Sequence, residues 1–166
     1  MNESFKLRLG TAQDIDQLFV IYMNEKVNHY LNFEITDINE FKEIFDDLMN
    51  SGDLYVYECN NQIVATCIVI RQKRRANHVV SLGTLATHPH FQRKGIGTRF
   101  INELINHLKV QGIKRIDLCT ETDNLMAHSF YKKLGFQQEG ILKKYYKRPY
   151  EDHFVDEYLM ALIFDE

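Results

Sequence analysis

Apolar and polar residues follow two periods along this chain of 166 residues. Apolar residues that alternate with polar ones, or that form short β-branched runs, predict strands, whereas apolar residues every three or four positions predict helices. Strands are predicted at residues 4–9, 54–59, 63–70, 79–87, 113–120 and 155–164. Helices are predicted after cap signals at Thr11 and Asp37, and over residues 94–111 and 123–134. The mixture of the two element types indicates an α/β chain.

The segments between these elements carry turn and stop signals. Asn60 and Asn61 predict a tight turn between two strands, and Gly112 and Gly135 end the two later helices. The basic cluster 71–75 precedes another strand, so we interpret it as an exposed turn, with a phosphate or nucleic-acid role as the alternative. No repeat, linker or low-complexity segment divides the chain, and we expect one domain over residues 1–166.

Composition narrows the class of protein. The chain is 45% hydrophobic and 26% charged, and a chain of about 150 residues buries roughly 70% of its unfolded surface, so a core needs no disulfide or metal. No apolar run approaches the roughly 18 residues of a membrane helix, and the start of the chain lacks a secretory signal. We therefore expect a cytoplasmic protein with no membrane partner. The net charge of -3 argues against a nucleic-acid partner.

Metal and redox motifs are missing from the sequence. Cys59, Cys67 and Cys119 lie in apolar, strand-like segments and are predicted to be buried core thiols. The chain has no C-x-x-C and no H-E-x-x-H pattern, so we expect no metal site.

The segment after the strand at residues 79–87 carries the clearest chemical signal. A loop containing Gly95 and Gly97 runs into the start of a predicted amphipathic helix, beside Arg93 and Lys94. Free amides and the helix dipole make such a start an anion site, and glycine allows a phosphate to approach the backbone. The loop fits neither G-x-x-x-x-G-K-[ST] nor G-x-G-x-x-G.

Two segments together resemble the GCN5-related N-acetyltransferase (GNAT) family. Residues 92–97, QRKGIG, resemble that family's Q/R-x-x-G-x-G/A pyrophosphate loop, and residues 124–136 resemble its N-x-x-A-x-x-x-Y-x-x-x-G-F segment. The order of the predicted elements also fits this family. The resemblance implies the GNAT acyl-CoA N-acyltransferase fold, a V-shaped mixed β-sheet flanked by helices.

The same resemblance implies acetyl-CoA as co-substrate and assigns residues to it. The loop amides would hold the pyrophosphate, the strand edge at Leu85 to Thr87 would pair with the pantetheine arm, and Asn124 would contact that arm. Tyr131 would lie near the sulfur as general acid. The implied cofactor-binding residues are Leu85, Ala86, Thr87, Gln92, Arg93, Lys94, Gly95, Ile96, Gly97, Thr98, Asn124 and Tyr131.

The general base is less clear, because this chain departs from the best-known members. They carry a glutamate where this chain has Ser81, and no acidic residue lies between residues 76 and 91. An alkylammonium with a pKa of about 10.4 must lose a proton before it can attack, so another group is needed. The candidates are Glu34, which is our tentative choice, His78 and Glu121.

Direct transfer in a ternary complex is favoured over a covalent acetyl-cysteine, because neither Cys67 nor Cys119 has a histidine paired with it in the sequence. The alternative is a non-catalytic acyl-CoA-binding or regulatory module of the same fold. The tail from residue 139 onward resembles family branches that acetylate amino acids, small amines or protein N-termini. Acidic residues between 31 and 58 either favour a cationic acceptor or form a solvated helix face. The sequence leaves open whether the protein forms a homodimer.

Overall fold

The computed structural model describes residues 3–165, and its strands form a single seven-stranded mixed sheet in the order β1-β2-β3-β4-β5-β7-β6. The strands are β1 (Phe5–Leu9), β2 (Asp53–Cys59), β3 (Gln62–Arg71), β4 (Val79–Thr87), β5 (Arg115–Glu121), β6 (Gln137–Tyr146) and β7 (Val155–Ile163). The α-helices are α1 (Ile15–Tyr22), α2 (Glu25–Asn28), α3 (Ile38–Ser51), α4 (Ile96–Val110) and α5 (Leu125–Lys133). Single 3-10 turns are η1 (Ala12–Asp14), η2 (Arg74–Ala76) and η3 (Pro89–Phe91). The predicted mixed α/β class is confirmed.

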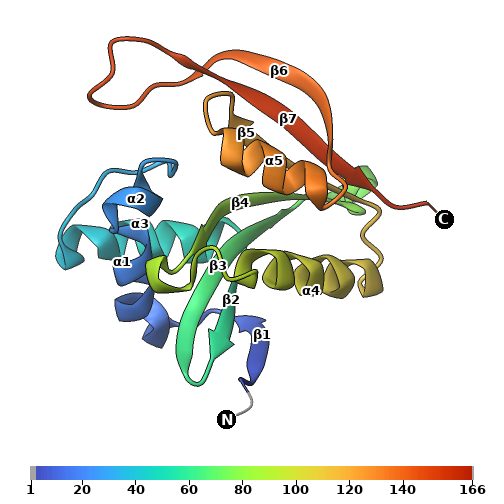
Figure 1. Cartoon of the computed structure of the whole chain (residues 1–166). Helices are drawn as coiled ribbons and strands as arrows, with labels where there is room; N and C mark the ends of the chain where they lie inside the picture. The colour runs from blue at the N-terminus through green and yellow to red at the C-terminus, as the bar shows by residue number, and fades with distance from the viewer. Residues whose placement is uncertain (1–2, 166) are drawn as a thin grey trace.

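Helices cover both faces of the sheet (Figure 1). On one face α1 and α3 pack their apolar residues against β2 and β3, as in the contact of Phe41 and Phe45 with the cluster around Ile68. On the other face α4 packs against the same strands through Phe100 and Leu104, and α5 continues this core over β5 and β7. Strand β3 lies between the two layers, which explains its nearly unbroken apolar run.

The sheet opens between β4 and β5. These strands pair in parallel only from Val79 to Leu82 and from Arg115 to Leu118, although both continue beyond the paired part. Strand β4 also contains a β-bulge, because it has one residue more than the segment of β3 between Thr66 and Ile68 with which it pairs. Thr84 lies in this bulge and has a φ of 46°. This bulge turns β4 away from β5, so the two strands separate as the arms of a V.

Two elements differ from the sequence-based expectation. Strand β6 was not predicted from the residue pattern, because it is an edge strand with mostly exposed side chains and therefore lacks the alternation of a half-buried strand. Helix α2 spans only one turn, which is too short to show a helical period. Strand β6 contributes Tyr145 and Tyr146 to the pocket described below, and the loop that follows α2 also lines it.

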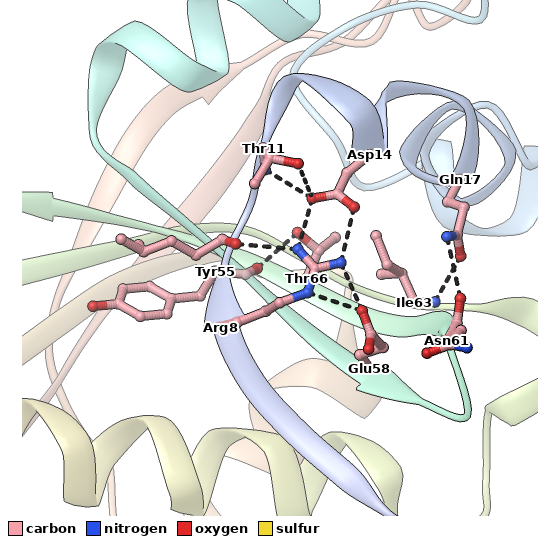
Figure 2. Close-up of polar contacts among 10 residues, drawn as sticks. Arg8, Thr11, Asp14, Gln17, Tyr55, Glu58, Asn61, Ile63 and Thr66 are labelled. Atoms are coloured by element: carbon pink, nitrogen blue, oxygen red, sulfur yellow. Dashed lines mark hydrogen bonds and ion pairs between the residues drawn. The ribbon is translucent and has the colours of Figure 1, made fainter.

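A polar network ties the first strand to the turn that follows it (Figure 2). The Arg8 guanidinium donates to both carboxylate oxygens of Asp14 at 2.8 and 2.9 Å, and to Glu58 on β2 at 2.8 Å. The Thr11 amide also donates to Asp14, at 2.7 Å. Burial alone would raise the pKa of Asp14, but the bonds from Arg8 and Thr11 outweigh it and hold that pKa below its ordinary value.

Replacing Asp14 by alanine is expected to lower the free energy of unfolding by about 2 kcal/mol, because Arg8 loses one of its two carboxylate partners and the Thr11 amide loses its acceptor. The stabilisation depends on ionised Asp14, so in the wild type it is lost as pH falls through the lowered pKa. Urea unfolding near neutral pH measures the difference. Asp16→Ala, an exposed neighbour, is the control, and an equal loss there would refute this role for the network.

Candidate active site

The start of α4 has the geometry of an anion site. Gly95 is the N-cap with a φ of 75°, no side chain caps the helix, and its first turn contains no acidic residue. By contrast, α3 and α5 are capped by the side chains of Asp37 and Asn124. Within residues 3–165, the amides of residues 94–98 donate to no backbone carbonyl, and the first bond across the cap runs from Arg99 to Gly95 at 3.0 Å. These amides are free to bind a phosphate.

The loop before α4 has a left-handed backbone conformation at Arg93 and is bonded to β4 through Gln92. Arg93 has a φ of 59°, and the Gln92 side chain donates to the Thr87 carbonyl at 3.3 Å, which links the loop to the end of β4. A Cβ added at Gly97 would lie 3.5 Å from the Thr87 hydroxyl, an ordinary contact. The predicted pyrophosphate residues therefore lie together, beside the opening between β4 and β5.

The strand edge and the start of α5 face the same opening. Residues 85–87 pair with β3 on one side and have no strand partner on the side facing β5 in the described structure. Asn124 lies at the end of β5, where its Oδ1 accepts from the Ala127 amide at 3.1 Å. Its side-chain nitrogen is not part of that bond. A donor and an open strand edge are thus available to an extended arm.

Tyr131 is buried on α5, with 8% of its surface exposed. Its ring packs edge-on against Phe130 and Phe136, with centroids 5.3 and 5.7 Å apart. Burial, and then the charges of Cys67 and Glu121, raise the pKa of Tyr131 above its ordinary value, so the phenol stays protonated throughout the physiological range.

A pocket of about 400 Å³ lies where β4 and β5 have separated. It is bounded by the loop after α2, the bulge of β4, the end of β5 and the β6–β7 hairpin. Its lining residues are Tyr30, Leu31, Asn32, Thr84, Cys119, Glu121, Tyr145, Tyr146 and Glu157. We call this space the acceptor pocket.

Two carboxylates line the acceptor pocket from neighbouring strands. Glu121 on β5 is directly opposite Glu157 on β7, and they are 6% and 8% exposed. Burial, with a further contribution from the charge of Glu157, raises the pKa of Glu121 to about 7. Burial also raises the pKa of Glu157. A carboxyl that titrates near neutral pH is suited to proton transfer.

The hairpin is anchored to the rest of the pocket wall by Arg148. This arginine is buried, and its two terminal nitrogens donate to Asp123 at 2.7 and 2.9 Å and to Glu151 at 3.2 Å. Tyr146 donates from its hydroxyl to the Leu31 carbonyl. These contacts join the hairpin, the start of α5 and the loop after α2. A second pocket of about 470 Å³ shares Leu31, Asn32 and Tyr146 with the first.

The other sequence candidates for the base lie elsewhere. Glu34, the tentative choice, lines the second pocket and not the acceptor pocket. His78 precedes β4, and its carbonyl accepts hydrogen bonds from the start of β5. Glu121 is at the other end of β5, and the seven residues of this strand span roughly 20 Å, so His78 lies far from Glu121. Ser81 lies in the paired part of β4 and donates to Asp117 at 2.5 Å. Of the three candidates, only Glu121 reaches the acceptor pocket.

The cysteine predictions are partly wrong. Cys59 and Cys67 are buried, and burial raises the pKa of Cys67 to about 12. Cys119 is exposed and lines the acceptor pocket, because it points to the open face of β5 while Leu118 and Thr120 point to the core. Partial desolvation within the pocket, followed by the charges of Glu157 and Asp117, raises the pKa of Cys119 to about 11, so the thiol is a poor nucleophile.

The basic cluster forms the exposed turn between β3 and β4, where Arg71 pairs with Asp53 at 2.7 Å. Among residues 3–165, no group of three or more His, Cys, Asp and Glu side chains could hold a metal ion. In the same part of the chain, every helix is too short or too polar to cross a membrane.

Comparison with known proteins identifies the family. The model of the acetyltransferase (GNAT) family matches residues 13–136. N-alpha-acetyltransferase 50 of Danio rerio is 29% identical over 138 residues, which cover 79% of this chain and 80% of that protein. The L-amino acid N-acetyltransferase AaaT of Escherichia coli is 35% identical over 100 residues, 58% of each. Spermidine N-acetyltransferase from Vibrio cholerae, solved with CoA and spermine, has a TM-score of 0.80 at 18% identity and covers 96% of this chain and 95% of that one.

This chain therefore belongs to the GNAT family. The high TM-score confirms the GNAT fold. The protein is an enzyme, an acetyl-CoA-dependent N-acetyltransferase, as the family match establishes.

Proposed function

We propose that the protein transfers an acetyl group from acetyl-CoA directly to a primary amine, with both substrates bound in the opening between β4 and β5. The observation that carries this proposal is that the free amides at the start of α4 and the acidic acceptor pocket lie at the same opening. Holding both reactants there can supply an effective molarity of about 10⁵ M or more. A covalent acetyl-enzyme is not needed.

The residues that we assign to the cofactor fit its chemistry. The amides of residues 94–98 would bind the pyrophosphate, with Arg93 and Lys94 adding positive charge, and the open edge at residues 85–87 would pair with the pantetheine amides. Asn124 would donate its free amide nitrogen to the same arm. When bound, the cofactor supplies an acetyl thioester. The protein holds it in place and excludes water.

We assign the general base to Glu121, in place of Glu34. An acceptor enters as an ammonium, and Glu121, with a pKa of about 7, is ionised often enough to accept its proton and is buried in the wall of the acceptor pocket. An alkylammonium has a pKa of about 10.4 in water. In the pocket the two carboxylates would raise this pKa, whereas partial desolvation would lower it. Glu121 also lies where the acceptor must approach the thioester.

We assign the role of general acid to Tyr131. The raised pKa of this phenol means that it does not lose its proton in the resting enzyme, so it acts as a hydrogen-bond donor to the thiolate as that group departs. A thiolate with a parent pKa of about 8.5 needs only partial help to leave. The contribution of Tyr131 should therefore be at the low end of the range for general acids.

From the sequence alone, the alternative to an enzyme was a non-catalytic acyl-CoA-binding module of the same fold. The two are separated by thiol release from acetyl-CoA, measured over a panel of alkylamines, amino acid amides and short peptides. An enzyme releases thiol only when an amine is added and forms an amide of matching mass. Binding of acetyl-CoA with no thiol release across the whole panel would refute the proposed function.

Tyr131→Phe tests the role of the phenol, because it keeps the ring packing and removes the donor. We expect kcat to fall by about 10²-fold while Kd for acetyl-CoA is unchanged. The loss should shrink toward pH 9, where the free thiolate is the stable form. Phe130→Leu, which alters the packing around Tyr131 without touching its hydroxyl, is the control. Equal kcat for wild type and Tyr131→Phe from pH 6 to pH 9 would make Tyr131 a packing residue only.

A further inference from the structure

The acceptor pocket has acidic groups but no basic side chain among its lining residues. Glu121 and Glu157 contribute two buried carboxylates, and the rest of the wall consists of tyrosines, an asparagine, a threonine, a thiol and a leucine. Within residues 3–165, neither carboxylate forms a salt bridge with an arginine, lysine or histidine. No basic side chain is therefore paired with these two groups among the residues that line the pocket.

The nearest buried cation, Arg148, is already engaged. It lies close enough to Glu121 to act on its pKa, but its terminal nitrogens donate to Asp123 and Glu151. Its remaining nitrogen, Nε, is buried without a partner and is closed off from the solvent. The Arg148 side chain is only 6% exposed, so little of its guanidinium is open to a carboxylate on a substrate.

These charges act differently on the amines that the family uses. An alkylamine or the N-terminus of a peptide brings only positive charge to Glu121 and Glu157, which attract it. A free α-amino acid carries a carboxylate on the same carbon as its amine. Placing the amine at Glu121 forces that carboxylate close to Glu157, where like charges repel strongly because the site is buried.

We propose that Glu157 and Glu121 make this enzyme select primary amines with no carboxylate on the amine-bearing carbon, and reject free α-amino acids. The acceptor class is thus an alkylamine or an amide-linked N-terminus. This inference rests on the proposed function, since it concerns the acceptor of the same reaction. This selectivity distinguishes small amines and N-termini from free amino acids, which the sequence motifs do not distinguish.

The test compares leucine, leucinamide and 3-methylbutylamine, which share a side chain and differ at the carboxyl position. We expect kcat/KM for leucinamide to exceed that for leucine by about 100-fold. 3-Methylbutylamine should also be a substrate, and its rate relative to leucinamide tells whether small amines or N-termini are preferred.

Glu157→Gln isolates the electrostatic cause. The ratio of kcat/KM for leucinamide to kcat/KM for leucine should fall by about tenfold in this variant. The two amines have different pKa values, but this difference affects wild type and variant equally and cancels when their ratios are compared. Asp156→Asn is the matched control: it removes a carboxylate from the same strand, but this residue is paired with Lys143 outside the pocket. Its ratio should equal the wild-type ratio.

Wild-type enzyme gives a second readout that needs no variant. Between about pH 6 and pH 7.5 the neutral fractions of both α-amines rise in parallel, so amine titration leaves the ratio constant. Ionisation of Glu121, whose pKa burial raises to about 7, should widen the ratio over this interval.

Equal kcat/KM for leucine and leucinamide, a ratio that does not change with pH, or a ratio unaltered in folded Glu157→Gln would overturn the inference while the enzyme remains an N-acetyltransferase. Absence of thiol release with every amine would instead refute the proposed function, and with it the acceptor class.

Discussion

Glu121→Gln is expected to lower kcat for the best amine by about 10²- to 10⁴-fold, with little change in Kd for acetyl-CoA. The amide has the same shape as the carboxylate but cannot accept a proton. Because burial raises the pKa of Glu121 to about 7, wild-type kcat/KM should fall as the pH is lowered through about 7, beyond the loss caused by amine protonation. This extra loss should be absent in the variant.

The stability of Glu121→Gln provides a check on folding. A carboxyl with a raised pKa in the native state destabilises the protein above that pKa, where it must be ionised while buried. Glutamine removes this cost, so the melting temperature of the variant at pH 8 should be no lower than that of the wild type. Glu34→Gln in the neighbouring pocket should reduce kcat by less than about tenfold. A larger loss there than at Glu121 would contradict the assignment of the base.

Gly97→Glu is expected to abolish binding of acetyl-CoA, for which we expect a Kd in the micromolar range in the wild type. The substitution places a side chain and a negative charge beside the free amides at the start of α4. The variant should still fold, because the added Cβ meets Thr87 and Phe130 at 3.5 and 3.6 Å and Gly97 has no left-handed φ. Calorimetric titration measures the loss.

The control for Gly97→Glu carries the same charge further along α4. Asn102→Glu lies on the exposed side of this helix and should bind acetyl-CoA as the wild type does. Wild-type affinity in folded Gly97→Glu would remove the phosphate-loop assignment. Gly95 is unsuitable for this test, because its φ of 75° would strain any other residue.

The sequence predicts those parts of the fold that depend on local signals. Thr11 and Asp14 form the expected capping box, Asp37 caps α3, and the bounds of β4 agree with its apolar run. The open start of α4 was also predictable, because a glycine loop that enters a helix is a local feature, and its use as an anion site stays a prediction. The structure shows that its amides are free, which residue types alone cannot establish.

The acid–base chemistry of the pocket was less predictable, because it depends on contacts between distant segments. Glu157 lies in a strand pattern that gives no sign of its partner, and only the register of β5 with β7 places it opposite Glu121. Cys119 was predicted as a core thiol because its neighbours are apolar, but the splay of β4 and β5 exposes its face of the strand. Glu34 was favoured for its loop position, and the fold places it in the adjoining pocket.

The most direct test of the central claim is the initial rate of thiol release over a matrix of acetyl-CoA and amine concentrations, with the best amine from the panel. Direct transfer in a ternary complex predicts a rate that depends on both substrates and double-reciprocal lines that intersect. Parallel lines would contradict direct transfer and indicate an acetyl-enzyme. A rate that does not depend on the amine would contradict N-acetyl transfer at this site.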